Sequence, residues 1–79
     1  MSNIEKYDQA FAEILNVSPE QMAGLKYQDI EAWDSIGHMG LIAVIEDAFD
    51  IMMDTDDIID FSSYEKGKEI LTNNYDIEF

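Results

Sequence analysis

Apolar side chains recur along this chain at the spacing of an α-helix. Over residues 3–16 most of them are three or four positions apart, which gathers them on one side of a helix. Those positions are Ile4, Tyr7, Phe11, Ile14 and Leu15. A second and stronger helical pattern covers residues 35–50. Its apolar face consists of Leu41, Ile42, Ile45 and Phe49. No segment shows the alternation of a β-strand, so the pattern predicts an all-α fold.

Capping residues predict a short helix after the first. Ser18 is followed by a proline and, three positions after the serine, by Gln21, which is the sequence of a helix start. Gly24 is a suitable end for this helix. Residues 25–33 have no clean period, and we expect an ordered loop that large apolar side chains hold against the core. These side chains are Leu25, Tyr27, Ile30 and Trp33.

Two more helices are expected in the last third of the chain. Asp54 or Thr55 can cap a helix that continues to Phe61, and Ser62 with Glu65 forms the serine-x-x-glutamate pattern that opens a helix to about residue 73. Residues 74–79 are expected to fray. The chain is therefore predicted to be a single domain over residues 1–79, with its core over about residues 4–72.

The charge balance is strongly acidic. The chain has 18 Asp and Glu residues against four lysines and no arginine, for a formal net charge of −14. Binding to nucleic acid is not expected, because neutralising phosphates needs clustered Lys and Arg, and an anionic membrane surface is disfavoured for the same reason. The charge favours basic protein partners, although it is also consistent with solubility alone.

The sequence shows no targeting signal, no membrane-spanning segment and no cysteine. The first residues lack the basic flank and apolar stretch of a signal peptide, and no segment approaches the ~20 apolar residues that span a bilayer. We therefore expect a cytoplasmic protein that contacts no membrane. The absence of cysteine excludes disulfides, thiolate catalysis and cysteine-based zinc sites.

Ser35 is the candidate functional residue. It lies where a loop turns into the strongest predicted helix, and Asp34 before it already provides a good N-cap, so the serine hydroxyl is not needed for capping. A phosphodiester on Ser35 would lie at the positive end of the helix, beside free backbone N–H groups. Attachment of a covalent prosthetic group is one reason to present a serine in this way.

The segment Asp34-Ser35-Ile36, followed by a helix with apolar and acidic positions, resembles the attachment motif of the acyl carrier protein family. The helix positions that carry the resemblance are Leu41, Ile42, Ile45, Glu46, Asp47 and Phe49. The order and spacing of the later helices extend the resemblance over about residues 4–72. It implies a small four-helix bundle with a long loop between the first and second main helices.

The resemblance also implies a function. A separate phosphopantetheinyl transferase would transfer 4′-phosphopantetheine from coenzyme A to Ser35, which Asp34 and Ile36 flank. The thiol of this arm would carry an acyl or aminoacyl group as a thioester and present it to loading ligases, acyltransferases or synthases. The chain itself would not be an enzyme, and the pathway could be that of fatty acids, surface polysaccharides or secondary metabolites.

A partner surface can be predicted from the helical wheel of residues 35–50. Opposite the apolar face, an outward stripe of small and apolar residues is bordered by acids, which suits a partner with an apolar pocket ringed by Lys or Arg. The stripe consists of Ile36, Gly40, Ala43 and Asp47, with Glu46 and Asp50 at its border. The alternative is a merely solvated face. Gly37 and Gly40 either allow a partner to approach this surface closely or have no role there. The protein is expected to be a monomer.

The acidic residues after position 53 are a candidate calcium-binding loop. Asp54, Asp56 and Glu65 have the spacing of positions 1, 3 and 12 of a calcium loop, but Ile58 and Ile59 occupy positions that need an oxygen ligand and a glycine. No metal site is therefore expected, and the alternative is loose binding of divalent cations to the acidic surface, which would relieve charge repulsion.

His38, the one histidine, follows Ser35 by three residues, a helical spacing that rarely aligns a base with a nucleophile, so we expect it to lie at the surface or to contact a partner. A carried group could be sheltered in a cavity lined by Leu41, Ile45, Ile58 and Phe61, or the core could be packed too tightly to admit it. The rival function is that of an acidic, non-enzymatic interaction protein, such as an inhibitor or nucleic-acid mimic. A small hydrolase ranks third, because a triad is lacking.

Overall fold

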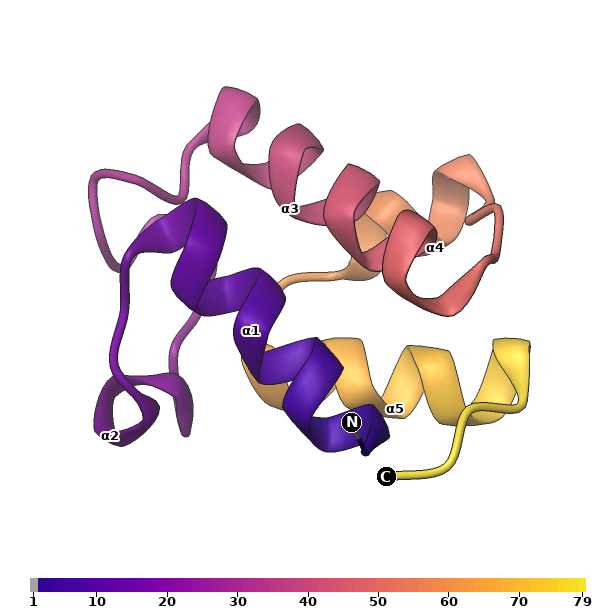
Figure 1. Ribbon diagram of the computed structural model, residues 1–79. Helices are drawn as coiled ribbons and strands as arrows, with labels where there is room; N and C mark the ends of the chain where they lie inside the picture. The colour runs from indigo at the N-terminus through magenta and orange to yellow at the C-terminus, as the bar shows by residue number, and fades with distance from the viewer. Residues whose placement is uncertain (1) are drawn as a thin grey trace.

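The computed structural model describes residues 2–79 and contains five α-helices in that range, without a β-strand. They are α1 (Asn3–Leu15), α2 (Pro19–Met22), α3 (Ser35–Phe49), α4 (Thr55–Asp60) and α5 (Tyr64–Tyr75). The all-α prediction is confirmed, and each helix lies where the capping and periodicity placed it to within a few residues. In Figure 1, α1 crosses the front, α3 runs along the top and α5 lies below, while α4 links α3 to α5.

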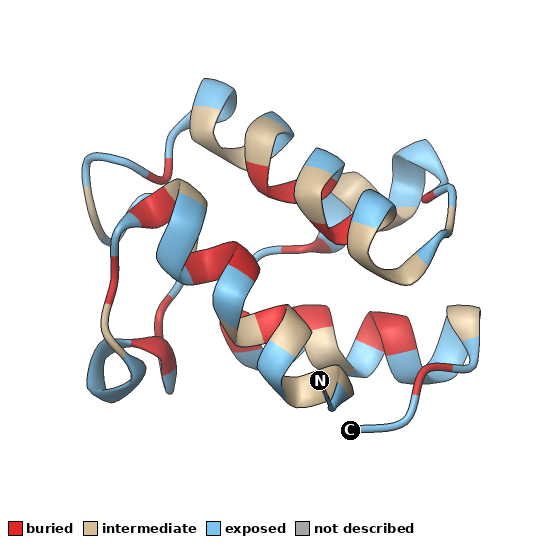
Figure 2. Ribbon diagram, viewed as in Figure 1, coloured by how far each residue is buried: buried red, intermediate tan, exposed pale blue. Residues whose placement is uncertain are grey.

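The core consists of the inward faces of α1, α3 and α5 and of the long loop (Figure 2). Aromatic rings form its centre: the ring of Phe11 meets that of Trp33 at 5.5 Å and that of Tyr64 at 5.1 Å between centroids. The buried Tyr7 hydroxyl donates to the Tyr64 carbonyl oxygen at 2.7 Å. Gly67 is required beside this contact, since a Cβ there would overlap the Tyr7 hydroxyl.

The loop between α2 and α3 is packed as predicted. Leu25 and Trp33 are buried, and Trp33 has no exposed surface. Backbone hydrogen bonds join the loop to the linker between α4 and α5: the Tyr27 N–H donates to the Ser62 oxygen at 2.8 Å, and the Tyr64 N–H donates to the Leu25 oxygen at 2.9 Å. The loop that precedes Ser35 is therefore tied to the segment that follows α4.

Two local predictions are wrong. The N-cap of α5 is Ser63, whose hydroxyl oxygen accepts from the Lys66 N–H at 2.9 Å, so Ser62 and Glu65 do not form the expected capping box. Ser63 takes this role because the extended backbone that pairs with the loop persists to it.

The predicted frayed tail is docked instead. Asp76 adopts a left-handed conformation with φ of 60°, which turns the chain back, and the Ile77 N–H then donates to the Leu71 oxygen at 3.1 Å. This turn is a common way to end a helix, and it buries Ile77. The Phe79 ring lies 5.2 Å from that of Tyr7.

None of the helices in residues 2–79 combines the length and the apolar character needed to cross a bilayer.

Candidate functional site

Ser35 is the first residue of α3 and is exposed. The carboxylate of Asp34 caps the helix as predicted, with Oδ1 accepting from the Gly37 N–H at 2.8 Å. Within residues 2–79 no hydrogen bond engages the Ser35 side chain. The hydroxyl is thus accessible at the positive end of a 15-residue helix and is not used for capping.

Glycine 37 has a role that differs from the two foreseen. It does not lie on an open outward face, because a Cβ at Gly37 would overlap the carbonyl oxygen of Ala32. The glycine therefore lets the loop fold closely over the first turn of α3. This close approach fixes the direction of the chain immediately before Ser35.

His38 links the loop, α3 and α4. The Trp33 indole N–H donates to His38 Nδ1 at 2.9 Å, and the second ring nitrogen, Nε2, donates to the Ile58 carbonyl oxygen at 2.8 Å. Because Nδ1 accepts and Nε2 donates, the imidazole is neutral with its proton on Nε2. The ring is half-buried and both nitrogens are used within the protein, whereas the sequence predicted a surface or partner contact.

A groove of about 330 Å³ opens beside Ser35. Its lining is mostly apolar and comes from the long loop, α3, α4 and the linker to α5. The lining residues are Tyr27, Ser35, His38, Met39, Ile58, Ile59, Phe61 and Ser62. Met39 is 56% and Ile59 is 71% exposed, which is high for large apolar side chains. The groove could not be read from the sequence because it is assembled from separate segments.

The predicted outward stripe is only partly on one open surface. Ile36 is 84% exposed, and Ala43, Asp47 and Asp50 are also exposed. Gly40 is half-buried, and a Cβ there would lie 3.6 Å from Ile14 Cγ2 of α1, so this position faces its neighbouring helix.

Glu46, which the sequence predicts at the border of the stripe, instead forms a hydrogen bond within the protein. It is half-buried, and its Oε2 accepts from the Met53 N–H at 2.8 Å, which holds the segment between α3 and α4.

The four residues that are expected from the sequence to line a sheltering cavity do not share one cavity. Ile58 and Phe61 line the groove, whereas Leu41 and Ile45 have no exposed surface and belong to the closed core.

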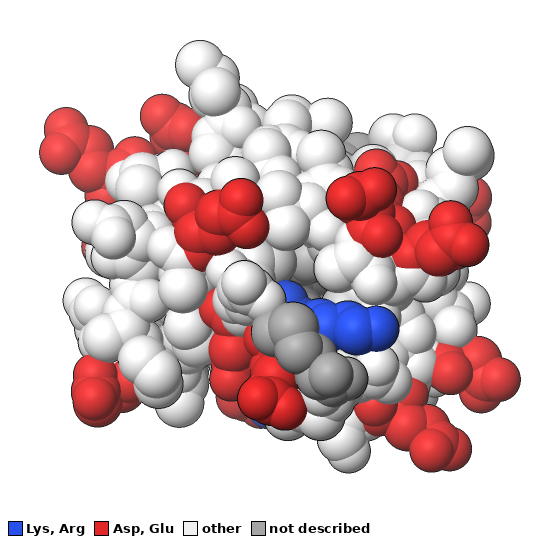
Figure 3. All heavy atoms as spheres, viewed as in Figure 1, with Lys and Arg blue, Asp and Glu red and all other residues white. Residues whose placement is uncertain are grey.

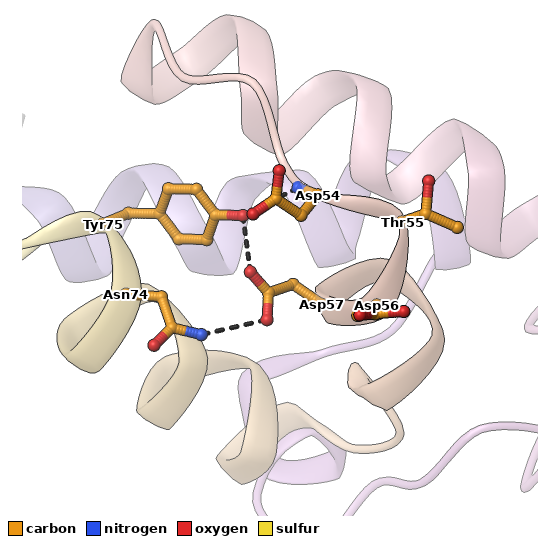
Figure 4. Close-up of a pocket in the computed structure, with 6 residues that line it drawn as sticks. All are labelled: Asp54, Thr55, Asp56, Asp57, Asn74 and Tyr75. Atoms are coloured by element: carbon orange, nitrogen blue, oxygen red, sulfur yellow. Dashed lines mark hydrogen bonds between the residues drawn. The ribbon is translucent and has the colours of Figure 1, made fainter.

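Acidic side chains are scattered in clusters over the face in Figure 3. Three acidic residues at the start of α4, Asp54, Asp56 and Asp57, line a pocket together with Asn74 and Tyr75 of α5. In Figure 4, Asp57 receives hydrogen bonds from two residues of α5, the Tyr75 hydroxyl at 2.6 Å and the Asn74 amide at 2.9 Å. The Tyr75 hydroxyl also accepts from the Asp54 N–H at 2.8 Å. Desolvation and the Asp57 carboxylate raise the pKa of Tyr75. This cluster joins two helices, and residues 2–79 contain no group of His, Cys, Asp or Glu arranged to hold a metal ion.

The arrangement at Ser35 is that of a presented hydroxyl and not of an activated nucleophile. The nearest histidine, His38, has both ring nitrogens engaged with Trp33 and Ile58, so it is not placed to act as a base for Ser35. What the site offers is an accessible serine hydroxyl beside an apolar groove. Comparisons of this chain with protein-family models, with curated proteins and with solved structures found no match.

Proposed function

We propose that this chain is a carrier protein in which Ser35 bears a covalent 4′-phosphopantetheine arm and presents an acyl or aminoacyl group to other enzymes. The observation that supports this best is the position of the Ser35 hydroxyl, which is exposed at a helix N-terminus, not needed as a cap, and at the edge of an apolar groove. The resemblance of Asp34-Ser35-Ile36 to the attachment motif of acyl carrier proteins supports the same function.

The residues around Ser35 fit such a group. In the attachment reaction the Ser35 oxygen would bond to the phosphorus of the phosphopantetheine moiety of coenzyme A and lose its proton, and adenosine 3′,5′-bisphosphate would leave. The free N–H groups in the first turn of α3 would stabilise the phosphodiester charge. Tyr27, Met39 and Ile59 would contact the arm along the groove. When attached, the arm supplies a thiol that holds the carried group as a thioester.

The charge of the chain supports partners with basic surfaces. A net charge of −14 would attract a phosphopantetheinyl transferase and loading enzymes whose docking surfaces carry Lys or Arg. Ile36 is exposed one residue after the proposed attachment point, with Asp47 further along α3 and Asp50 immediately after the helix. These residues, together with Ala43, are the partner surface that we propose. The chain would act as a cytoplasmic monomer without catalytic residues of its own.

Intact mass spectrometry tests the proposal. The folded chain is incubated with coenzyme A, Mg²⁺ and a broad-specificity phosphopantetheinyl transferase. We expect the gain of one phosphopantetheine unit, which Ser35→Ala abolishes. Ser62→Ala is the matched control, because Ser62 is an exposed serine that lines the same groove, and this variant should still gain the unit.

Two outcomes would contradict the proposal: no gain by a chain that circular dichroism shows to be folded, or a gain that survives Ser35→Ala. The first would favour the acidic interaction protein, whose function would rest on the charge alone, and the second would place the attachment on a residue other than Ser35.

A further inference from the structure

The seam between α3 and α4, beside Ser35, is closed by the imidazole of His38. The ring is hydrogen-bonded on both sides, to Trp33 in the loop and to the carbonyl of Ile58 in α4. Two other rings lie around it edge-on, Tyr27 at 5.3 Å and Phe61 at 5.9 Å between centroids. The floor of the groove is therefore a set of packed rings and not an opening into the core.

An acyl chain that is carried on Ser35 and enters the core would have to displace this imidazole. The Trp33 indole N–H would then be left without an acceptor although Trp33 has no exposed surface, and the Ile58 oxygen would lose its donor. Leaving such groups unpaired is unfavourable, and the residues beyond, Leu41 and Ile45, are close-packed without exposed surface.

We infer that His38 limits the depth of the groove, so that the group carried on Ser35 stays at the surface and is a small acyl or aminoacyl group instead of a long fatty chain. This inference rests on the proposed carrier function. A volume of about 330 Å³ lies near the lower end of the range for ligand sites, and the arm itself would occupy part of it. The groove therefore has little room for a long apolar chain.

A chain-length series tests the inference. Ser35 is loaded by the transferase from acetyl-, hexanoyl- and dodecanoyl-coenzyme A, each product is verified by intact mass, and its unfolding constant is measured by urea titration. We expect the hexanoyl and dodecanoyl forms to agree within about twofold, because the added methylenes remain in water. If the acyl chain entered the core, the unfolding constant of the protein would fall by roughly fourfold for each buried methylene. Such a continuing fall would overturn the inference.

Two variants locate the effect at His38. His38→Ala removes the ring, and we expect dodecanoyl to lower its unfolding constant at least about tenfold relative to hexanoyl. His38→Gln can still donate to the Ile58 oxygen and accept from the Trp33 N–H, so it should behave as the unmodified sequence does. Equal values for the two acyl forms of a folded His38→Ala would show that another residue closes the groove and would overturn the role of His38.

The wild-type series decides whether a long acyl chain enters the core even if His38→Ala does not fold. A complete lack of mass gain at Ser35 would instead contradict the carrier function, so the two failures are distinguishable.

Discussion

The indole N–H of Trp33 donates to Nδ1 of His38 at 2.9 Å, and the two rings lie nearly parallel, 6.2 Å apart with an interplanar angle of 19°. This contact joins the end of the long loop to the second turn of α3. Because Ser35 lies between the two residues in sequence, the contact fixes the chain on either side of the proposed attachment point. The backbone around Ser35 is held by side chains on both flanks.

Trp33→Phe should lower the free energy of unfolding by at least about 1–2 kcal/mol, because it removes a buried hydrogen bond, leaves His38 Nδ1 without a donor and vacates part of a fully buried site. Urea titration followed by circular dichroism measures this change. Tyr27→Phe is the control, because Tyr27 packs on the same rings but its hydroxyl forms no hydrogen bond within residues 2–79, and it should change stability by less than about 0.5 kcal/mol. Equal losses in the two variants would show that the Trp33 bond contributes nothing.

The two glycines of α3 give opposite predictions for the same substitution. Gly37→Ala should destabilise the fold by about 1–3 kcal/mol, because the new methyl group would overlap the Ala32 carbonyl oxygen and force the loop away. Gly40→Ala should stabilise it by about 0.5–1 kcal/mol, since its methyl group would make an ordinary 3.6 Å contact with Ile14 and alanine is the better helix former.

Thermal and urea unfolding of both glycine variants measure these effects. Destabilisation by Gly40→Ala would contradict the packing of α1 on α3 described above.

The sequence predicted the features that depend on neighbouring residues. The helices follow from apolar spacing, and the cap at Asp34 follows from its position before Ser35. The role of His38 could not be predicted, because one of its partners is a backbone carbonyl 20 residues away in α4, and a carbonyl leaves no signature in a sequence. The docking of Ile77 was missed for a related reason: it depends on a left-handed turn at Asp76, a residue that does not require that conformation.

Asp34→Ala should cost about 0.5–2 kcal/mol of stability, because the Gly37 N–H loses its acceptor at the N-terminus of α3. Asp34→Asn keeps an oxygen for this cap and should be nearly as stable as the original chain. The pair separates capping from a role in modification. If Asp34→Asn folds normally but is modified at Ser35 much more slowly, then the carboxylate acts on the transferase reaction and not only on the helix.

Alkaline pH should destabilise the fold through its buried tyrosines. Burial, and then the negative groups around it, raise the pKa of Tyr7 above its ordinary value, and burial with the hydrogen bond to Asp8 raises that of Tyr64. The folded chain thus keeps protons that the unfolded chain releases near pH 10, so stability is complete below about pH 10 and falls above it. The slope is at most about 1.4 kcal/mol per pH unit for each tyrosine.

Urea titrations from pH 9 to 11 measure this dependence. Tyr7→Phe should make the decline shallower, since one of the two groups is then absent, while the lysines contribute equally in both chains. An unchanged slope in Tyr7→Phe would show that Tyr7 ionises as readily in the folded chain as in the unfolded one.

Rising ionic strength should slow the modification of Ser35 by about tenfold or more if acidic residues of α3 attract the transferase. The chain offers a matched pair for this test. Asp50 and Asp76 are both exposed, both end a helix and both have positive φ, at 54° and 60°, but only Asp50 belongs to the proposed partner surface. Asparagine also tolerates this conformation, so either substitution removes one charge without disturbing the cap. Asp50→Asn should weaken the salt dependence of the modification rate more than Asp76→Asn does. Equal effects would mean that the enzyme responds to the total charge of −14 and not to a surface on α3.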